Sequence, residues 1–219
     1  MLRAADVVHE IVALAREFDA KVIGITGGIA VGKSTVAEAV ADALDFPTVS
    51  TDGFIRDDAG NRKGYADSYD ADALREFIDS FLATGVASAP RYSHLHYEVT
   101  AHEDIAGDGL VIDGLHLGHP LLGLRDRIDL LVHLDAPTDV LADWYLARFQ
   151  QLRTLARDEP TAMLYPYRDM DPAALDGMAM QVWRDLNTLV VDEVRAHESA
   201  ADVVVRLAPD HAVVEITRR

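Results

Sequence analysis

The sequence predicts one α/β domain of three layers, with a mainly parallel five-stranded central sheet flanked by helices. Residues 21–25 form a short apolar strand that leads through a glycine-rich loop into a helix beginning at Ser34. Further apolar strands at 46–50, 109–114 and 128–135 alternate with helical patterns, which is typical of βαβ units. A chain of 219 residues that is 49% hydrophobic is long enough for one such domain, spanning 1–219.

The composition restricts the partners and the compartment. A net charge of −17 disfavours nucleic-acid binding, because the phosphates of a nucleic acid would be repelled at long range. The absence of cysteine excludes disulfides and thiolate metal sites, and it fits a reducing compartment. The longest apolar runs are too short to cross a bilayer. We therefore expect a cytoplasmic protein with no membrane partner.

The first 20 residues predict an amphipathic helix. Charged or titratable side chains, among them Asp6, His9, Glu10 and Glu17, interrupt their apolar residues, unlike the uninterrupted core of a signal peptide. The expected buried face comprises Val8, Ile11, Val12, Ala15 and Phe18. Such a helix serves either the core or an interface.

The glycine-rich loop fits a phosphate-binding pattern at every fixed position. Gly27-Gly28-Ile29-Ala30-Val31-Gly32-Lys33-Ser34 matches G-x-x-x-x-G-K-[ST], and it lies between a strand and a helix as the motif requires. Lys33 would contact the β- and γ-phosphates, and the Ser34 hydroxyl would bind Mg²⁺. The expected nucleotide-binding residues are Gly27, Gly28, Ile29, Ala30, Val31, Gly32, Lys33, Ser34 and Thr35. The alternative is a glycine-rich turn with no ligand.

Two carboxylates follow predicted strands. Asp52 comes just after strand 46–50, and Asp113 lies at the end of strand 109–114. Ligands of parallel α/β sheets bind beyond the carboxyl ends of the strands, so both side chains are expected at the site. Asp52 would accept the proton of an attacking hydroxyl, and Asp113 would help Ser34 hold Mg²⁺. The alternative for each is ordinary turn or cap chemistry.

A long helix with Thr138 as its expected cap carries several arginines. Arg148, Arg153 and Arg157 lie where this helix leads into a loop, and we expect a mobile lid over about 148–171. Guanidinium groups on a lid would stabilise the charge of a transferring phosphoryl group. The alternative is that these arginines pair with the many acidic residues.

The remaining segments are less informative. Residues 84–108 show little periodicity, but 90–97 hold an aromatic and imidazole cluster that fits either a small polar ligand or a packed loop. A helix over 172–197 is expected to bury Leu175, Met178, Val182, Leu186, Leu189, Val190 and Val194. Short strands at 202–207 and 212–216 close the chain. No acid–histidine constellation stands out as a structural metal site.

Several segments together resemble the type I bacterial pantothenate kinases, a branch of the P-loop kinases that also includes uridine kinases and phosphoribulokinases. The matching segments occur in the family's order and are 27–35, 50–54, 63–70, 89–94, 111–115, 144–149 and 211–215. The Tyr92-Ser93-His94 segment and the Trp144-Tyr145-x-x-Arg148-Phe149 segment are more specific than the phosphate loop, which many unrelated enzymes share.

The resemblance implies a P-loop kinase fold and a role for each motif residue. ATP and Mg²⁺ would be the cofactors. Lys33, Asp52 and Arg148 would be catalytic, with Asp52 as the general base. The residues that would line the acceptor pocket together with Asp52 are Tyr92, His94, Tyr97, Tyr145 and Asn187. The acceptor would be a small molecule, pantothenate or a related compound, and the family precedent suggests a homodimer. The alternatives are a kinase for a nucleoside, a sugar or another hydroxylated metabolite, and a nucleotide-binding regulatory protein without transferase activity.

The sequence departs from the family in ways that affect the acceptor and regulation. The segment between Phe54 and Lys63 is shortened, Ala66 replaces the usual proline, and Asp113 stands where these kinases usually have glutamate. Glu38 replaces an arginine that in the family helps to bind inhibitory coenzyme A. A carboxylate at this position predicts weak or absent feedback by coenzyme A.

Overall fold

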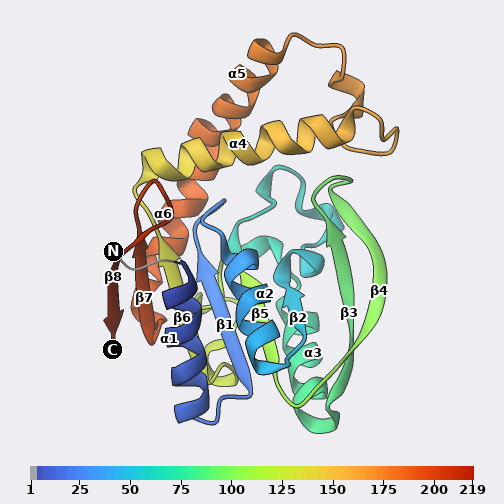
Figure 1. Ribbon diagram of the computed structural model, residues 1–219. Coiled ribbons are helices and arrows are strands. Elements are labelled where there is room, and N and C mark those ends of the chain that lie inside the picture. Colours follow the sequence, from blue (N-terminus) through green and yellow to red (C-terminus); the bar gives the residue numbers. More distant parts are fainter. Residues whose placement is uncertain (1–3) are drawn as a thin grey trace.

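The computed structural model describes residues 4–219 and is built around a twisted six-stranded sheet (Figure 1). Its strands, in spatial order, are β2 (Thr48–Ser50), β5 (Leu110–Gly114), β1 (Val22–Gly27), β6 (Leu130–Asp135), β7 (Val203–Leu207) and β8 (Val213–Arg218). The first five are parallel and β8 is antiparallel to β7. The prediction of a mainly parallel sheet is confirmed, and the strand predicted at 212–216 is β8, but the sheet has six strands where five were predicted.

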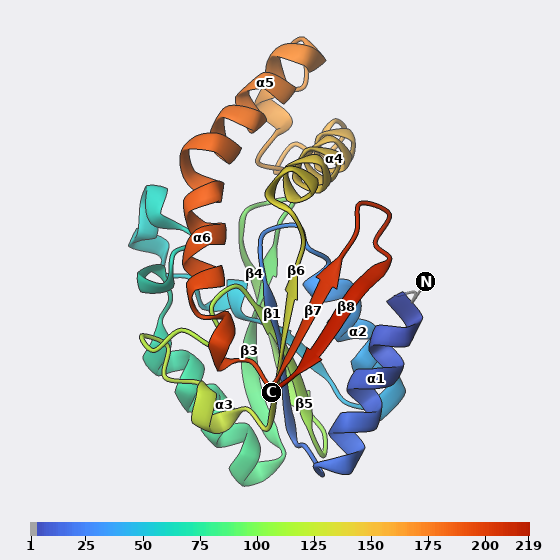
Figure 2. The ribbon, with the colours of Figure 1, turned by 90° about the vertical axis from the view of Figure 1, so that its left-hand side faces the viewer.

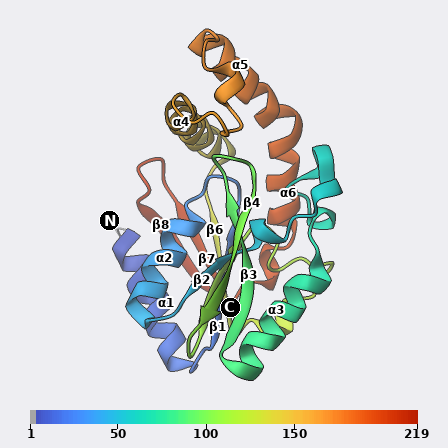
Figure 3. The same cartoon turned by 90° about the vertical axis from the view of Figure 1, so that its right-hand side faces the viewer.

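Helices cover both faces of the sheet, which completes the three predicted layers. One face carries α1 (Ala4–Glu17) and α2 (Lys33–Leu44), and the other carries α3 (Ala71–Thr84) and α6 (Thr188–Ala196), as the two edge-on views show (Figures 2 and 3). The central strands β1, β5 and β6 are buried along their whole length, as expected of parallel strands covered on both sides. No helix within residues 4–219 has the length and apolar character needed to span a bilayer.

Helices α4 (Thr138–Ala156) and α5 (Pro172–Val182) project beyond the carboxyl ends of the parallel strands (Figure 1). The Arg153 guanidinium joins the two helices by donating to the Asp176 carboxylate at 2.6 Å, and the Gln150 amide donates to the other oxygen of Asp176 at 2.8 Å. These two helices therefore form one unit above the end of the sheet where the phosphate loop lies.

The first helix largely matches the prediction. Ile11, Val12 and Ala15 are buried against the core, but Phe18 is 57% exposed, so its predicted burial is wrong. The helix ends at Glu17, and the chain turns sharply at Asp19, whose φ is 50°. Phe18 is the first residue beyond the helix, next to this turn, where its side chain stays exposed. Residues 1–3 of the predicted helix lie outside the described residues.

A separate β-hairpin occupies the stretch that the sequence predicts to be irregular. Strand β3 (Val86–Ser93) pairs antiparallel with β4 (Glu98–Ala106), and the hairpin packs beside α3. In β4 only Ile105 is buried. A strand without a buried face shows no alternation of apolar and polar residues, so the segment of β4 carries no pattern from which a strand could be predicted.

The end of the helical region differs from the predicted single helix. A π-helical turn, Trp183–Asn187, separates α5 from α6. Leu175, Val190 and Val194 are buried as predicted, but Met178, Val182, Leu186 and Leu189 are 37–54% exposed. The π turn changes which face points inward, so Trp183 and Val191 are buried instead.

The expected cap of α4 is also wrong. The N-cap is Pro137 and makes no side-chain capping bond, whereas the Thr138 hydroxyl accepts a hydrogen bond from Arg195 at 2.8 Å. Thr138 thus joins α4 to α6, because its side chain lies one position inside the helix.

Gly114, at the end of β5, is required by close packing. A Cβ at this position would lie 2.1 Å from the Thr51 hydroxyl oxygen. We expect Gly114→Ala to lower the free energy of unfolding by about 1–3 kcal/mol, measured by urea titration. Gly177→Ala is the matched control, because Gly177 lies inside α5 with open space around it and alanine should stabilise the helix. Equal stability of Gly114→Ala and the unsubstituted protein would contradict the packing argument.

Candidate active site

The phosphate loop joins the carboxyl end of β1 to the N-terminus of α2. At its start, Gly27 has φ 147°, and a Cβ there would lie 2.1 Å from the Leu134 carbonyl oxygen, so only glycine fits. The Lys33 ammonium donates to the Gly28 carbonyl at 2.8 Å, which holds its side chain across the loop. The amino terminus of α2 faces the same space, and its dipole favours negative charge.

Ser34 and Asp113 come together beneath the loop, as their expected shared role requires. The Ser34 hydroxyl donates to Oδ2 of Asp113, which is 5% exposed. Oδ1 of Asp113 is buried and has no hydrogen-bond partner within the described chain. A buried carboxylate oxygen without a partner, beside a hydroxyl oxygen, is a donor set suited to a hard cation.

Asp52 lies in the 3₁₀ turn Thr51–Phe54 that follows β2. Burial raises the pKa of its carboxyl, while the positive charges of Lys33 and Arg148 act in the opposite direction. Burial likewise lowers the pKa of Lys33 to about 8, with Asp113 and Asp52 raising it and Arg148 lowering it. Four charged groups, one from the turn after β2 and the others from α2, β5 and α4, thus interact in one cluster.

His94 contacts Asp52 directly. Its Nε2 lies 3.3 Å from Oδ2 of Asp52, whose side chain is 23% exposed. Burial, and secondly the charge of Arg148, lower the pKa of His94 to about 4. The imidazole is therefore neutral near pH 7, and an Nε2–H group would donate to the carboxylate without forming an ion pair.

Aromatic side chains from the β3–β4 hairpin surround this contact. The Tyr92 ring packs edge-on against His94 at 5.2 Å and against Tyr97 at 6.0 Å between ring centroids. The Lys63 ammonium lies 4.6 Å from the centroid of Tyr97. Lys63 was not among the predicted site residues. The available signal was its scarcity, because the chain has only two other lysines, Lys21 and Lys33.

The other predicted acceptor residues approach from above. Tyr145 on α4 contacts Asn187 in the π turn. Burial raises the pKa of the Tyr145 phenol, and the contact with Asn187 acts to lower it. Tyr145 also packs against Trp183 at 5.3 Å between ring centroids. Residues from the hairpin, α4 and the π turn therefore lie over the same end of the sheet.

The three predicted arginines of the projecting unit occupy different settings. Arg148 belongs to the charge cluster, since its field affects Lys33, Asp52 and His94. Arg153 is engaged by Asp176 and is part of the α4–α5 contact. Arg157 is exposed at the end of α4. Only Arg148 is brought to the cluster in this conformation.

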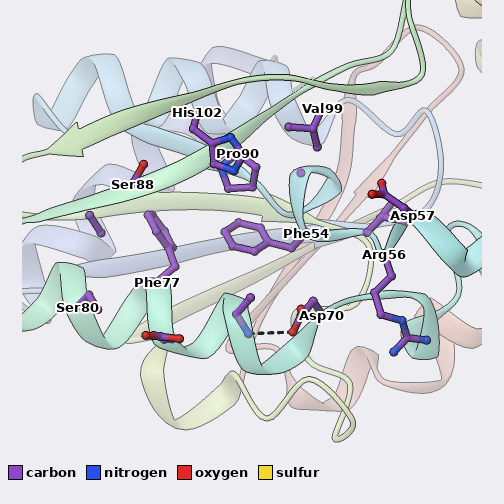
Figure 4. A pocket seen from close by; sticks show the side chains of 15 residues that line it. Phe54, Arg56, Asp57, Asp70, Phe77, Ser80, Ser88, Pro90, Val99 and His102 are labelled. Atoms are coloured by element: carbon purple, nitrogen blue, oxygen red, sulfur yellow. Dashed lines mark hydrogen bonds between the residues drawn. The ribbon is translucent and has the colours of Figure 1, made fainter.

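A separate groove of about 700 Å³ lies between α3 and the β3–β4 hairpin (Figure 4). Phe54 and Phe77 form its apolar floor, and the Asp70 carboxylate at its rim caps α3 by accepting from the Ala73 amide at 3.0 Å. The residues that line it include none of the site residues predicted from the sequence. The charge cluster therefore lies outside this groove.

The comparisons with known proteins identify the family of the chain. No family model matches the chain. It is 33% identical over 223 residues to the pantothenate kinase of Clavibacter michiganensis subsp. michiganensis, covering 90% of this chain and 70% of that protein. It is 32% identical over 226 residues to the pantothenate kinase of Streptomyces coelicolor, covering 90% and 69%. The chain belongs to the pantothenate kinase family. The resemblance seen in the sequence is thereby confirmed.

Solved structures show that the fold is that of P-loop kinases. A protein described as a fructose transport system kinase, from Silicibacter sp. TM1040, superposes with a TM-score of 0.66 at 16% identity, covering 84% of this chain and 88% of that one. YFH7 from Saccharomyces cerevisiae, described as a P-loop kinase with a circular permutation, gives 0.65 at 10% identity, covering 94% and 99%. This member of the pantothenate kinase family is a small-molecule kinase, and its family implies ATP as a substrate.

Proposed function

We propose that this protein transfers the γ-phosphoryl group of ATP to a hydroxyl group of pantothenate or a closely related compound. The observation that carries the proposal is the position of Asp52, which contacts His94 at 3.3 Å and interacts with the charges of Lys33 and Arg148. A base, a phosphate-binding cation and a second cation at one strand end are the groups that phosphoryl transfer to an alcohol needs. The pantothenate kinase names of the relatives support the acceptor.

The phosphates would lie in the loop at the N-terminus of α2. Backbone N–H groups of residues 27–35 and the Lys33 ammonium would bind the β- and γ-phosphates. Lys33 now donates to Gly28, so a phosphate oxygen would replace this carbonyl as its acceptor. The half-buried position of Lys33 strengthens its attraction for a polyanion, because water screens the charge less than at an exposed site.

Ser34 and Asp113 would hold a Mg²⁺ ion. The fit rests on the unpartnered, buried Oδ1 of Asp113 and on the adjacent Ser34 hydroxyl, both hard oxygen donors. Held by these two residues, Mg²⁺ would supply positive charge that neutralises part of the charge of the nucleotide phosphates. The Ser34 hydroxyl would release Asp113 and turn a lone pair toward the cation.

Asp52 would orient the acceptor hydroxyl and take its proton. Burial raises the pKa of Asp52, which makes the ionised carboxylate a stronger proton acceptor than an exposed aspartate. A neutral His94 would keep one oxygen of the carboxylate engaged and leave the other for the hydroxyl. Tyr92, Tyr97, Tyr145 and Asn187 would surround the rest of the acceptor with apolar faces and polar tips.

The unit formed by α4 and α5 would close over the site, with residues 148–171 as its lid segment. Closure would exclude water, which otherwise competes with the acceptor for the phosphoryl group. Arg148 would stabilise charge on the transferring group, and the Arg153–Asp176 contact would keep the two helices moving together. Arg157, exposed at the end of α4, would need a larger movement to reach the site.

The acceptor is tested with a panel. ADP formation would be measured with ATP, Mg²⁺ and, in turn, pantothenate, uridine, cytidine, ribulose 5-phosphate and several sugars. We expect strong turnover with pantothenate alone. Turnover with a nucleoside or sugar instead would retain the kinase activity and change the acceptor assigned to the pocket. The shortened segment after Phe54 would explain that result. ATP binding without turnover on any acceptor would overturn the proposal and favour a regulatory protein.

The surface of α2 predicts weak feedback by coenzyme A. Glu38 is exposed on α2, where the family pattern has an arginine for the inhibitor's phosphates. We expect ADP formation to be insensitive to coenzyme A and Glu38→Arg to create inhibition competitive with ATP. Asp42→Arg, one turn further along the same exposed face, makes the same charge change and should create none. Tight competitive inhibition of the unsubstituted protein would contradict this prediction.

A further inference from the structure

Tyr69 crosses beneath the turn that carries Asp52. Its own segment is bonded to the residues that follow Asp52, because the Asp70 amide donates to the Phe54 carbonyl at 2.7 Å and the Arg56 amide donates to the Ser68 carbonyl at 2.9 Å. Tyr69 itself forms an isolated antiparallel bridge with Ile55. The backbone at Tyr69 therefore anchors the downstream side of the turn.

The side chain of Tyr69 reaches the upstream side of the same turn. Its hydroxyl lies near the hydroxyl of Thr51, the residue immediately before Asp52, and the Tyr69 and Thr51 residues are 3% and 1% exposed. Neither hydroxyl makes a hydrogen bond of good geometry with any group in residues 4–219. The absence of a Cβ at Gly114 leaves the Thr51 hydroxyl directly against the backbone of β5. Two buried hydroxyls thus face each other where the catalytic turn meets the sheet.

The surroundings of Tyr69 keep its phenol protonated and ready to donate. Burial raises the pKa of Tyr69 well above its usual value, and the negative charge of Asp52 raises it further. Its ring also packs edge-on against His116, at 6.0 Å between centroids, which limits sideways movement. A buried donor and a buried acceptor that are not yet aligned carry a desolvation cost that a hydrogen bond between them would remove.

We propose that Tyr69 is a positioning residue for Asp52, whose hydroxyl bonds to Thr51 in the substrate complex and fixes the catalytic turn. Hydrogen bonds of this kind are often long or poorly aligned before substrate binds and shorten in the reactive complex. With its backbone on one side of Asp52 and its hydroxyl on the other, Tyr69 spans the turn from Thr51 to Ile55. The proposal depends on the proposed catalytic role of Asp52.

The test is a double-mutant cycle with Tyr69→Phe and Thr51→Val, two changes that remove a hydroxyl and keep the shape of the side chain. We expect each single variant to lower kcat about tenfold, with the Kd for ATP and the KM for the acceptor unchanged. The double variant should lose no more than either single variant, because both remove the same contact. Thr217→Val, on the edge strand β8 far from the cluster, is the matched control and should keep full activity.

The thermal midpoint separates positioning from a structural role. Removing a buried hydroxyl that lacks a partner should leave the Tm unchanged or higher, so a fall in kcat without a fall in Tm supports positioning. Three results would each overturn the positioning role of Tyr69. They are an unchanged kcat in Tyr69→Phe, losses of kcat that multiply in the double variant, and a loss of kcat that parallels a loss of Tm. Asp52→Asn is measured in parallel. If Asp52→Asn keeps its turnover, the proposed catalytic role of Asp52 is rejected. If Asp52→Asn loses turnover and Tyr69→Phe does not, only the proposed role of Tyr69 is rejected.

Discussion

Asp52→Asn should lower kcat by about 10²- to 10⁴-fold, the usual contribution of a general base, while ATP binds as before. Asparagine keeps the shape of the side chain but cannot accept the hydroxyl proton. Because burial raises the pKa of Asp52 in the folded protein, ionisation of this carboxyl costs folding free energy. The cost grows as the pH rises from the pKa of the unfolded chain to that of the folded protein, and it is constant above the folded value. The variant should therefore not lose thermal stability near pH 7. Steady-state ADP formation and calorimetric ATP binding measure the two effects.

Asp58→Asn is the matched control for this prediction. Asp58 follows six residues later, with its side chain 84% exposed and an ion pair to Arg56 at 3.4 Å. It should keep full turnover. Turnover of Asp52→Asn within threefold of the unsubstituted protein would show that Asp52 is not the base, and the site would then need another proton acceptor.

Lys33→Met should lower kcat/KM for ATP by roughly 10²- to 10³-fold, as expected when a preorganised cation is removed from a transferring phosphoryl group. Methionine retains most of the side-chain length and removes the charge. Lys21→Met is the control, because Lys21 lies at the start of β1 with its side chain 51% exposed and only a 4.0 Å ion pair to Asp19. Full activity of Lys33→Met would mean that the loop binds no phosphate.

The same lysine predicts a pH dependence. Burial lowers the pKa of Lys33 to about 8, so the free enzyme loses this positive charge as the pH rises through 8. A bound polyanion favours the charged form and raises the pKa, hence the affinity for ATP should fall as the pH rises above 8. Calorimetric titrations at pH 7 and pH 9 measure the affinity for ATP at each pH. In Lys33→Met the two affinities should be equal.

Part of the candidate site could be predicted from the sequence, because some of its residues occupy fixed positions in a motif or at the end of a strand. The phosphate loop and the two strand-end carboxylates could be placed because parallel strands bring their carboxyl ends to one edge, and Ser34 does meet Asp113 there. The contact of Asp52 with His94 needed the family resemblance as well. Nothing in local spacing relates the two, because His94 belongs to a hairpin with almost no hydrophobic alternation.

The failures share a physical cause, which is tertiary contact that local pattern does not encode. The Arg153 side chain is engaged at 2.6 Å by Asp176 of the neighbouring helix, a partner that the sequence could not identify. Leu186 and Leu189 fit an apolar stripe only if the helix is regular, and the π turn breaks that register. Tyr69 lies in a segment noted only for its resemblance, and the backbone bonds that bring this segment against residues 54–56 are tertiary contacts.

The measurement that tests the central claim most directly is an internal competition. The enzyme would receive ATP and Mg²⁺ with an equimolar mixture of pantothenate, uridine, cytidine and ribulose 5-phosphate, and mass spectrometry would identify which compound gains a phosphoryl group. The ratio of products reports the ratio of kcat/KM values directly. The account predicts phosphorylated pantothenate as the dominant product, formed at least about 100-fold more slowly when Asp52→Asn replaces the unsubstituted protein. A dominant phosphorylated nucleoside or sugar, or an Asp52→Asn variant that forms product at a rate close to that of the unsubstituted protein, would contradict it.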